Sequence, residues 1–244
     1  MSSAREAKAL MLAVGAALAM TATAAQATGV VVATSGPSAG KYPVGHKVGD
    51  DERIVLAAGD SVTVLDARGT RIFKGAGTYT LGQQAAAAKT GTFALLTRER
   101  AAQRMRTGAV RGGVGEPVTR PNLWYVDVAS SGAMCVPDTD DIRLWRATTE
   151  GNETVTIRPA GSGAATQAVF RDGEMLSPWN ARDLPVQDGS SFVISQPKAA
   201  DRTVTFKLLG TVPSEPEALA EDLILHGCTA QLEVLAQAMR VDEE

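Results

Sequence analysis

The two cysteines of this chain are the residues whose chemistry is easiest to foresee. Cys135 and Cys228 are the only cysteines in the 244 residues. In an oxidising compartment we expect them to pair, closing a loop of 94 residues and tying the C-terminal segment to the β region before it. Such a bridge contributes about 4 to 5 kcal/mol in the chain-entropy model. The alternative is two buried thiols that pack as small apolar side chains.

One serine has the spacing of a hydrolase nucleophile. Ser38 lies in the run GPSAG at 36–40, which fits G-x-S-x-G, and His226 follows in the order that a serine hydrolase would use. A nucleophile elbow must lead into a helix, and Pro43 and Gly45 disfavour one here. The same stretch also falls short of a phosphate-binding loop. A secreted serine hydrolase built on Ser38 and His226 is therefore the alternative to a protein without catalytic residues.

Metal-ligating patterns are weak. Asp138, Asp140 and Asp141 resemble half of a calcium loop, but the glycine and the distal glutamate of that loop are missing, so we expect a solvated turn. His46 and His226 have no metal partner near them in the sequence. We expect neither a metal nor a cofactor.

Aromatic and basic residues are the candidate ligand contacts. Trp124 and Trp179 could stack on sugar rings, although large aromatics in a small β domain more often pack in its core. Six arginines and two glutamates lie between positions 98 and 120, whereas eight acidic residues and one arginine follow position 213. The basic run could contact anionic lipid or polysaccharide, or simply be an exposed linker. Its candidate contacts are Arg98, Arg100, Arg104 and Arg106.

The N-terminus has the pattern of a secretory signal peptide. Arg5 and Lys8 precede an apolar run over 9–25, and residues 25–27 (AQA) form an A-x-A cleavage site. A membrane anchor is the rival interpretation, but the run is rich in Ala, Gly and Thr and is too short and interrupted to span a bilayer. We expect cleavage after Ala27, no insertion into the membrane afterwards, and a periplasmic or secreted protein. An envelope protein or a polysaccharide is then the expected partner, and nucleic acid is not.

Composition agrees with a globular exported protein. The chain is 44% apolar and 5% aromatic, with 24 basic and 27 acidic side chains. Between residues 28 and 96, short strand patterns alternate with Gly and Asp turns. The expected strands are 29–34, 53–57, 61–65, 70–74, 78–81 and 92–96. Within one of them, Val62 and Val64 should face one side of the sheet and Thr63 and Leu65 the other.

The run from Leu56 to Leu81, LAAGDSVTVLDARGTRIFKGAGTYTL, resembles the β-rich periplasmic domain of the FecR family. The shared features are a Gly-Asp before a strand and a short turn that leads to a second strand. The resemblance implies a periplasmic ligand-sensing or envelope-associated module. Signalling members of that family also have a cytoplasmic helix and a transmembrane segment before the module, which this chain lacks, so a direct anti-sigma role is not implied.

The second half of the chain predicts a β-sandwich. Residues 97–121 form an Arg- and Gly-rich linker with a possible short helix at its start. Seven strand patterns then follow within 122–212, which is the spacing of a sandwich. They are 123–128, 133–136, 142–146, 154–158, 167–171, 191–195 and 203–209. The run LPVQDGSSF at 184–192 is similar to the corner before a core strand in fibronectin type III and other immunoglobulin-like domains.

A helix is predicted over 213–244. Ser214 and Glu217 have the spacing of a capping box, and Pro216 suits the first turn. An apolar stripe recurs at helical spacing, and Gly227 either lies within one helix or divides it into two. The stripe consists of Leu219, Leu223, Cys228, Leu232, Leu235 and Met239. The sequence thus predicts a mainly β, exported, non-catalytic protein that acts as a binding, sensing or structural module of the cell envelope. A glycan- or peptidoglycan-binding module is a second alternative.

Overall fold

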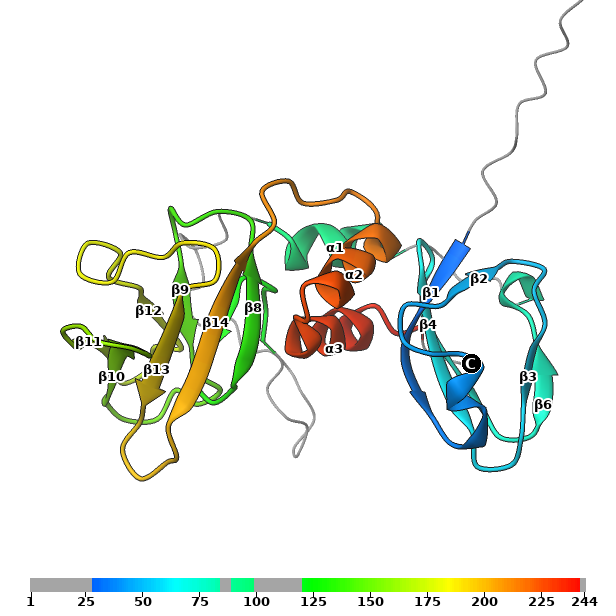
Figure 1. Ribbon diagram of the computed structural model, residues 1–244, viewed down its shortest axis with the longest axis horizontal. Coiled ribbons are helices and arrows are strands. Elements are labelled where there is room, and N and C mark those ends of the chain that lie inside the picture. The colour runs from blue at the N-terminus through cyan, green and yellow to red at the C-terminus, as the bar shows by residue number, and fades with distance from the viewer. Residues whose placement is uncertain (1–27, 84–88, 99–119, 242–244) are drawn as a thin grey trace, which may run out of the picture.

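The computed structural model describes residues 28–83, 89–98 and 120–241. It is a mainly β protein in which two β units lie on either side of a central layer of helices (Figure 1). The predicted signal peptide at 1–27 and most of the Arg-rich segment lie outside the described residues. In the part of the chain that is described, no helix has the length and apolar character needed to cross a bilayer.

The N-terminal unit contains one four-stranded antiparallel sheet and one two-stranded sheet. The larger sheet has the order β2-β1-β4-β5 and the smaller one pairs β3 with β6. The strands are β1 (Thr28–Ser35), β2 (Lys47–Gly49), β3 (Ile54–Leu56), β4 (Ser61–Asp66), β5 (Gly69–Lys74) and β6 (Gly77–Tyr79). Their apolar side chains enclose a small core around Tyr42, Ile54 and Leu81. Five of the six predicted strands are therefore confirmed, and the short β2 is an addition.

Alternation along β4 explains how one sheet serves two cores. Val62 and Val64 are fully buried in the core of the N-terminal unit, as the period-2 pattern predicts. Leu65 points to the opposite face and packs among the helices. The same division holds in β1, where Val31 faces inward and Val32 faces the helices. Both faces of the sheet are thus covered at these positions.

The strand predicted over 92–96 is wrong, because these residues lie in the helix α1 (Thr90–Leu96). Phe93 and Leu96 are three residues apart, so a helix places both on one face. Both side chains are buried against the helical layer. Local β propensity is overridden by this packing.

The second unit is a sandwich of two sheets around one apolar core. The five-stranded sheet has the order β11-β10-β13-β14-β8, and the three-stranded sheet has the order β12-β9-β7. The strands are β7 (Tyr125–Asp127), β8 (Gly132–Val136), β9 (Arg143–Trp145), β10 (Glu153–Pro159), β11 (Thr166–Phe170), β12 (Leu176–Pro178), β13 (Ser191–Ser195) and β14 (Arg202–Leu208). All seven predicted strands are present, and β12 is an addition.

Aromatic side chains organise the centre of the sandwich. Trp179, Phe192 and Phe206 meet edge to face, with ring centroids 4.9 to 5.9 Å apart. The surrounding core contains residues from both sheets, including Ile157 and Leu144. The two sheets therefore share one interior.

The C-terminal segment forms two helices, α2 (Pro216–Leu225) and α3 (Thr229–Ala238). The chain breaks at Gly227, whose φ of 71° lies in the left-handed region that glycine tolerates. Every member of the predicted apolar stripe is buried. The alternative of two helices is therefore the one that the structure adopts.

The predicted capping box at the start of α2 is wrong. Glu215, not Ser214, precedes the first helical residue, and no side chain caps the helix. The reason is Pro216, which occupies the first turn and pushes the residue before it into an extended conformation (φ −105°, ψ 135°). Glu217 is consequently one position too early to complete the box.

A third core joins the helices to both β units. Val32 and Leu65 come from the N-terminal unit, and Leu123, Trp124 and Cys135 come from the sandwich. Between them lie the buried residues of the three helices, among them Leu219, Leu223, Leu232 and Leu235. The helical layer is therefore a shared hydrophobic interior between the two units.

Candidate functional site

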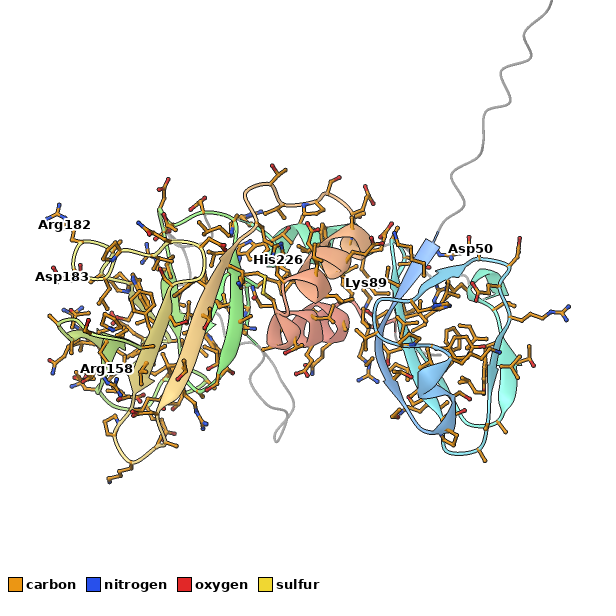
Figure 2. All side chains as sticks on the ribbon, viewed as in Figure 1. Asp50, Lys89, Arg158, Arg182, Asp183 and His226 are labelled. Atoms are coloured by element: carbon orange, nitrogen blue, oxygen red, sulfur yellow. A yellow bond between two sulfur atoms is a disulfide. The ribbon has the colours of Figure 1, made fainter. Side chains whose placement is uncertain are left out.

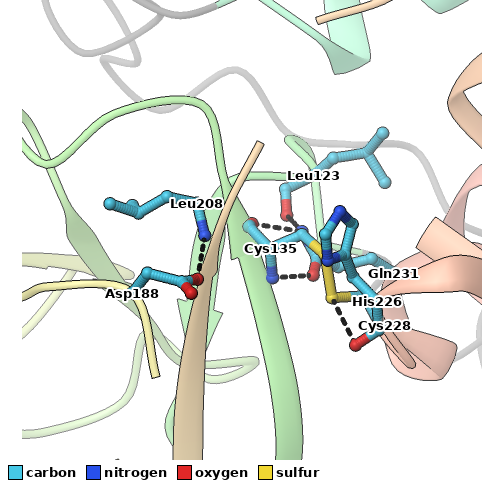
Figure 3. Close-up of a disulfide and its surroundings, with 7 residues drawn as sticks. All are labelled: Leu123, Cys135, Asp188, Leu208, His226, Cys228 and Gln231. Atoms are coloured by element: carbon cyan, nitrogen blue, oxygen red, sulfur yellow. Dashed lines mark hydrogen bonds between the residues drawn. A yellow bond between two sulfur atoms is a disulfide. The ribbon is translucent and has the colours of Figure 1, made fainter. Parts of the chain in front are cut away.

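The junction between the sandwich and the helices carries the disulfide. Cys135 on β8 and Cys228, which immediately precedes α3, are bonded, with their Cα atoms 5.9 Å apart (Figure 3). Both residues are fully buried. The predicted pairing is confirmed, and the alternative of two free thiols is wrong. The bridge fixes the turn between α2 and α3 to the edge of the five-stranded sheet.

Gln231 completes the same edge. β8 is the last strand of its sheet, so one side of its backbone has no neighbouring strand. The Gln231 side-chain oxygen accepts a hydrogen bond from the Cys135 N–H at 2.7 Å, and its amide nitrogen donates to the Cys135 carbonyl at 2.8 Å (Figure 3). The same nitrogen donates to the carbonyl of Leu123 at 2.9 Å. All of these groups are buried, so each bond prevents an unsatisfied polar group.

Arg120 lies beside this junction. It is 6% exposed, and its guanidinium donates to the carbonyl of Tyr125 at 2.9 Å and, more weakly, to that of Ala230 at 3.4 Å. Burial lowers the pKa of Arg120, and the negative charge of Asp127 opposes that effect. No sequence motif distinguishes Arg120 or Gln231 from the residues around them. The available signal for Gln231 was a polar residue inside an otherwise apolar helical stripe.

A charged cluster occupies the other side of the helical layer. The carboxylate of Asp66 accepts hydrogen bonds from Arg71 and from Arg68, and Arg68 also pairs with Asp50 at 2.6 Å. Nearby in α2, the Oε2 atom of Glu217 is buried without a hydrogen-bond partner. Burial raises the pKa of Glu217, a hydrogen bond from its own backbone N–H opposes this, and the charges of neighbouring acidic groups, including Asp66, add to the rise.

One residue of the C-terminal segment, Arg240, pairs with Thr70 at the edge of the N-terminal sheet. The N–H of Thr70 on β5 donates to the carbonyl of Met239 at 2.7 Å, and the N–H of Val241 donates back to Thr70 at 3.0 Å. The Lys89 ammonium donates to the carbonyl of Arg240. At Gly69, which has a φ of 137°, an added Cβ would lie 2.6 Å from the Met239 oxygen, so only glycine allows this approach. The edge of β5 is therefore partly covered.

The structure does not bring the candidate nucleophile and base together. Ser38 lies in a short 3-10 helix (Pro37–Gly40) of the N-terminal unit. His226 directly follows α2 in the helical layer (Figure 2). The partner of Ser38 is Asp60, whose Oδ1 atom accepts the Ser38 N–H at 3.0 Å. Hydrogen bonds from the Ser38 side chain and from the Ser38 and Ala57 backbones lower the pKa of Asp60, with desolvation opposing them.

This arrangement gives Asp60, which precedes β4, and Gly36 a structural role. Gly36 has a φ of 94°, and an added Cβ would lie 2.5 Å from the Asp60 carboxylate. The carboxylate therefore holds the loop at 36–40 against the start of β4. Ser38, Gly36 and Asp60 therefore all serve to anchor this loop.

The candidate ligand contacts have different positions. Trp124 and Trp179 are both 7% exposed, and their indole N–H groups donate to the carbonyls of Thr97 and Leu184. Their burial favours the core-packing interpretation over sugar stacking. Arg98 is described and exposed, whereas Arg100, Arg104 and Arg106 lie outside the described residues.

The acidic run behaves as the turn that was expected. Asp138 accepts a hydrogen bond from the N–H of Asp140, and Asp141 pairs with Arg143 at 2.6 Å. Within the described residues, no three His, Cys, Asp or Glu side chains gather closely enough to hold a metal ion.

No family model, curated protein or solved structure matches this chain. The resemblances to FecR-like and fibronectin type III-like domains therefore stay predictions.

Proposed function

We propose that this protein is an exported, non-catalytic component of the cell envelope, periplasmic or secreted, that acts as a binding, sensing or structural module. The observation that carries the proposal is the buried Cys135–Cys228 disulfide. Structural disulfides persist in oxidising compartments and are rare where thiols are kept reduced. This bond supports the export that the N-terminal pattern at 1–27 predicts.

The helical layer supports a role as a rigid two-part module. Apolar side chains from both β units share one core with the helices, and this core is reinforced by Gln231 and by the disulfide. A large apolar interface opposes movement between domains. The protein then holds two β surfaces at a fixed separation, which suits a scaffold or a sensor.

The loop around Ser38 supports a non-catalytic role. The Asp60 carboxylate accepts hydrogen bonds from the backbone N–H and from the hydroxyl of Ser38. Ser38 therefore anchors the loop. A serine nucleophile must be within hydrogen-bond reach of its base, and no hydrogen bond joins Ser38 to the predicted base His226 in the described part of the chain. The FecR-like and fibronectin type III-like resemblances are further, independent reasons to expect binding or sensing in the envelope.

Fractionation with crosslinking tests the proposal. The full chain carrying a C-terminal tag should be recovered outside the cytoplasm, and crosslinking in intact envelopes should capture a discrete envelope protein or polysaccharide. A matched chain lacking residues 2–27 should stay in the cytoplasm and capture neither. Recovery of the full chain in the cytoplasm would contradict the proposal. So would an esterase activity that is lost in Ser38→Ala while the fold persists.

A further inference from the structure

Arg120 differs from the other buried arginines of the described residues. Three arginine side chains are buried there: Arg71, Arg120 and Arg146. Arg71 pairs with the carboxylate of Asp66. Arg146 donates to four backbone carbonyls and to the carboxylate of Glu153. Arg120 has two carbonyl acceptors, and it pairs with no carboxylate of the described chain.

The hydrogen-bonding capacity of Arg120 is also unfilled. Its Nε atom is buried without an acceptor. The negative charge of Asp127 acts on Arg120, but no hydrogen bond joins the two side chains. A buried donor without an acceptor opposes folding. Arginine keeps its proton in proteins, so the group cannot escape this cost by becoming neutral. An anion supplied from outside would give the Nε–H group an acceptor.

A hollow lies where such an anion would be needed. Arg120, Asp127, Ser130, Ala133, Ala230 and Gln231 are among its lining residues. Its volume is about 20 Å³. Pockets for drug-sized ligands measure about 300 to 1,000 Å³, so this hollow has room for no more than one small chemical group of a ligand.

The edge of β8 offers a second donor in the hollow. The Cys135 N–H and carbonyl face Gln231, whereas the Val136 carbonyl faces β14 and accepts from Leu209. Backbone groups alternate along a strand, so Ala133 turns its N–H to the same side as Cys135. On this side of β8, Gln231 bonds only the backbone groups of Cys135. Ala133, two residues earlier on the strand, lines the hollow.

The negative charge of Asp127 disfavours a dianion in the hollow. Asp127 also lines it, with its two carboxylate oxygens accepting from the Ala129 N–H at 2.9 Å and the Ser130 hydroxyl at 2.6 Å. These local bonds hold Asp127 on its own loop. Its charge disfavours a dianion such as phosphate, whereas a planar carboxylate matches the donor geometry of a guanidinium.

We propose that the hollow between β8 and α3 binds a carboxylate group, with Arg120 as its counter-ion and the Ala133 N–H as a second donor. This site deepens the binding role proposed above. It is tested on purified protein, so its failure would leave the export proposal untouched.

Titration of the full chain with sodium acetate tests the site, with sodium chloride at equal ionic strength as the control. By NMR, acetate should shift the backbone amide of Ala133 and the Nε–H of Arg120 with one saturable curve, and chloride should not. Equal shifts with both salts, or no shift at these two groups, would overturn the proposal.

Substitutions identify the charge that matters. Arg120→Gln should weaken acetate binding about tenfold or more, because a charge-assisted bond is lost. Arg158→Gln is the matched control, since Arg158 lies on the sandwich away from the helical layer and is exposed (Figure 2). Unchanged binding in Arg120→Gln would contradict the site.

Asp127→Asn covers the case in which Arg120→Gln fails to fold. It removes the like charge, so acetate should bind severalfold more tightly. The Asn oxygen can still accept the Ala129 N–H, and its amide nitrogen can donate to the Ser130 hydroxyl. Unchanged or weaker binding would show that the acetate does not lie beside Asp127 and Arg120. That result would overturn the proposal.

Peptides distinguish the source of the carboxylate. Acetyl-Gly-Gly presents a peptide C-terminus, and its amidated form is the control. Binding much tighter than that of acetate would assign the site to peptide ends, and similar binding would assign it to small carboxylates. Equal binding of the amidated form would contradict recognition of a carboxylate.

Discussion

The Gln231 side chain binds Cys135 as a neighbouring β-strand would. Its amide accepts the Cys135 N–H and donates to the Cys135 carbonyl, at 2.7 and 2.8 Å, so α3 takes the place of a missing strand at the edge of β8. The disulfide of Cys135 leads into the same helix. Both the Gln231 hydrogen bonds and the disulfide therefore attach the helical layer to the sandwich at Cys135.

Replacing Gln231 tests the energetic weight of this contact. Gln231→Met keeps the side-chain length but leaves three buried backbone groups unsatisfied, so it should lower the free energy of unfolding by about 3 kcal/mol or more. Chemical denaturation under oxidising conditions measures the change. Gln237→Met on the exposed face of α3 is the control. A loss no larger than that of the control would contradict the bridging role.

Removing the disulfide tests its contribution. The double variant Cys135→Ala, Cys228→Ala should be less stable by up to about 4 kcal/mol, because the unfolded chain loses a long-range constraint. The parent protein treated with reductant under denaturing conditions provides a comparison without substitutions. Coincident denaturation curves for oxidised parent and double variant would show that the bond is not a structural staple.

Glu217 predicts a dependence on pH. Its pKa is raised on folding, so the folded state binds the proton more tightly than the unfolded state. The stability gained is complete below the unfolded pKa of Glu217 and is lost as pH rises through the raised, folded value. Glu217→Gln should flatten this part of the profile and be the more stable protein at neutral pH. Thermal denaturation between pH 4 and 8, with Glu233→Gln as control, measures it; an unchanged slope would contradict the assignment.

Asp60 predicts the opposite sign. Its pKa is lowered on folding by the hydrogen bonds from Ser38 and Ala57, so its contribution is present above the unfolded pKa and is lost as pH falls through the lowered value. Asp60→Asn should therefore have a lower melting temperature than the parent at neutral pH, and the difference should shrink in acid. Asp140→Asn, in an exposed turn, should show no such trend. A constant difference at all pH values would exclude the carboxylate as the cause.

The strands were predictable because their signals are local. Val62 and Val64 alternate with polar neighbours, and the turn at 66–69 is marked in the sequence, so β4 and β5 follow from pattern alone. β2 buries only Val48, and β12 ends in a proline, so neither presents a strand pattern. Both strands form at the edge of a sheet, β2 by pairing with β1 and β12 by pairing with β9.

The junction was only partly predictable, because it depends on contacts between distant residues. The pairing of Cys135 with Cys228 followed from cysteine count and compartment. The bonds of Gln231 to Cys135 span 96 positions, and α1 became helical through packing that its own residues do not reveal. Arg120 lies at the end of an Arg-rich run, and no local pattern distinguished it from its neighbours.

Intact mass spectrometry of the protein recovered from fractionated cells, without reductant, tests the central proposal most directly. We predict a polypeptide outside the cytoplasm that begins at Thr28 and carries the Cys135–Cys228 bond. A chain found in the cytoplasm with residues 1–27 still attached and both thiols free would contradict it.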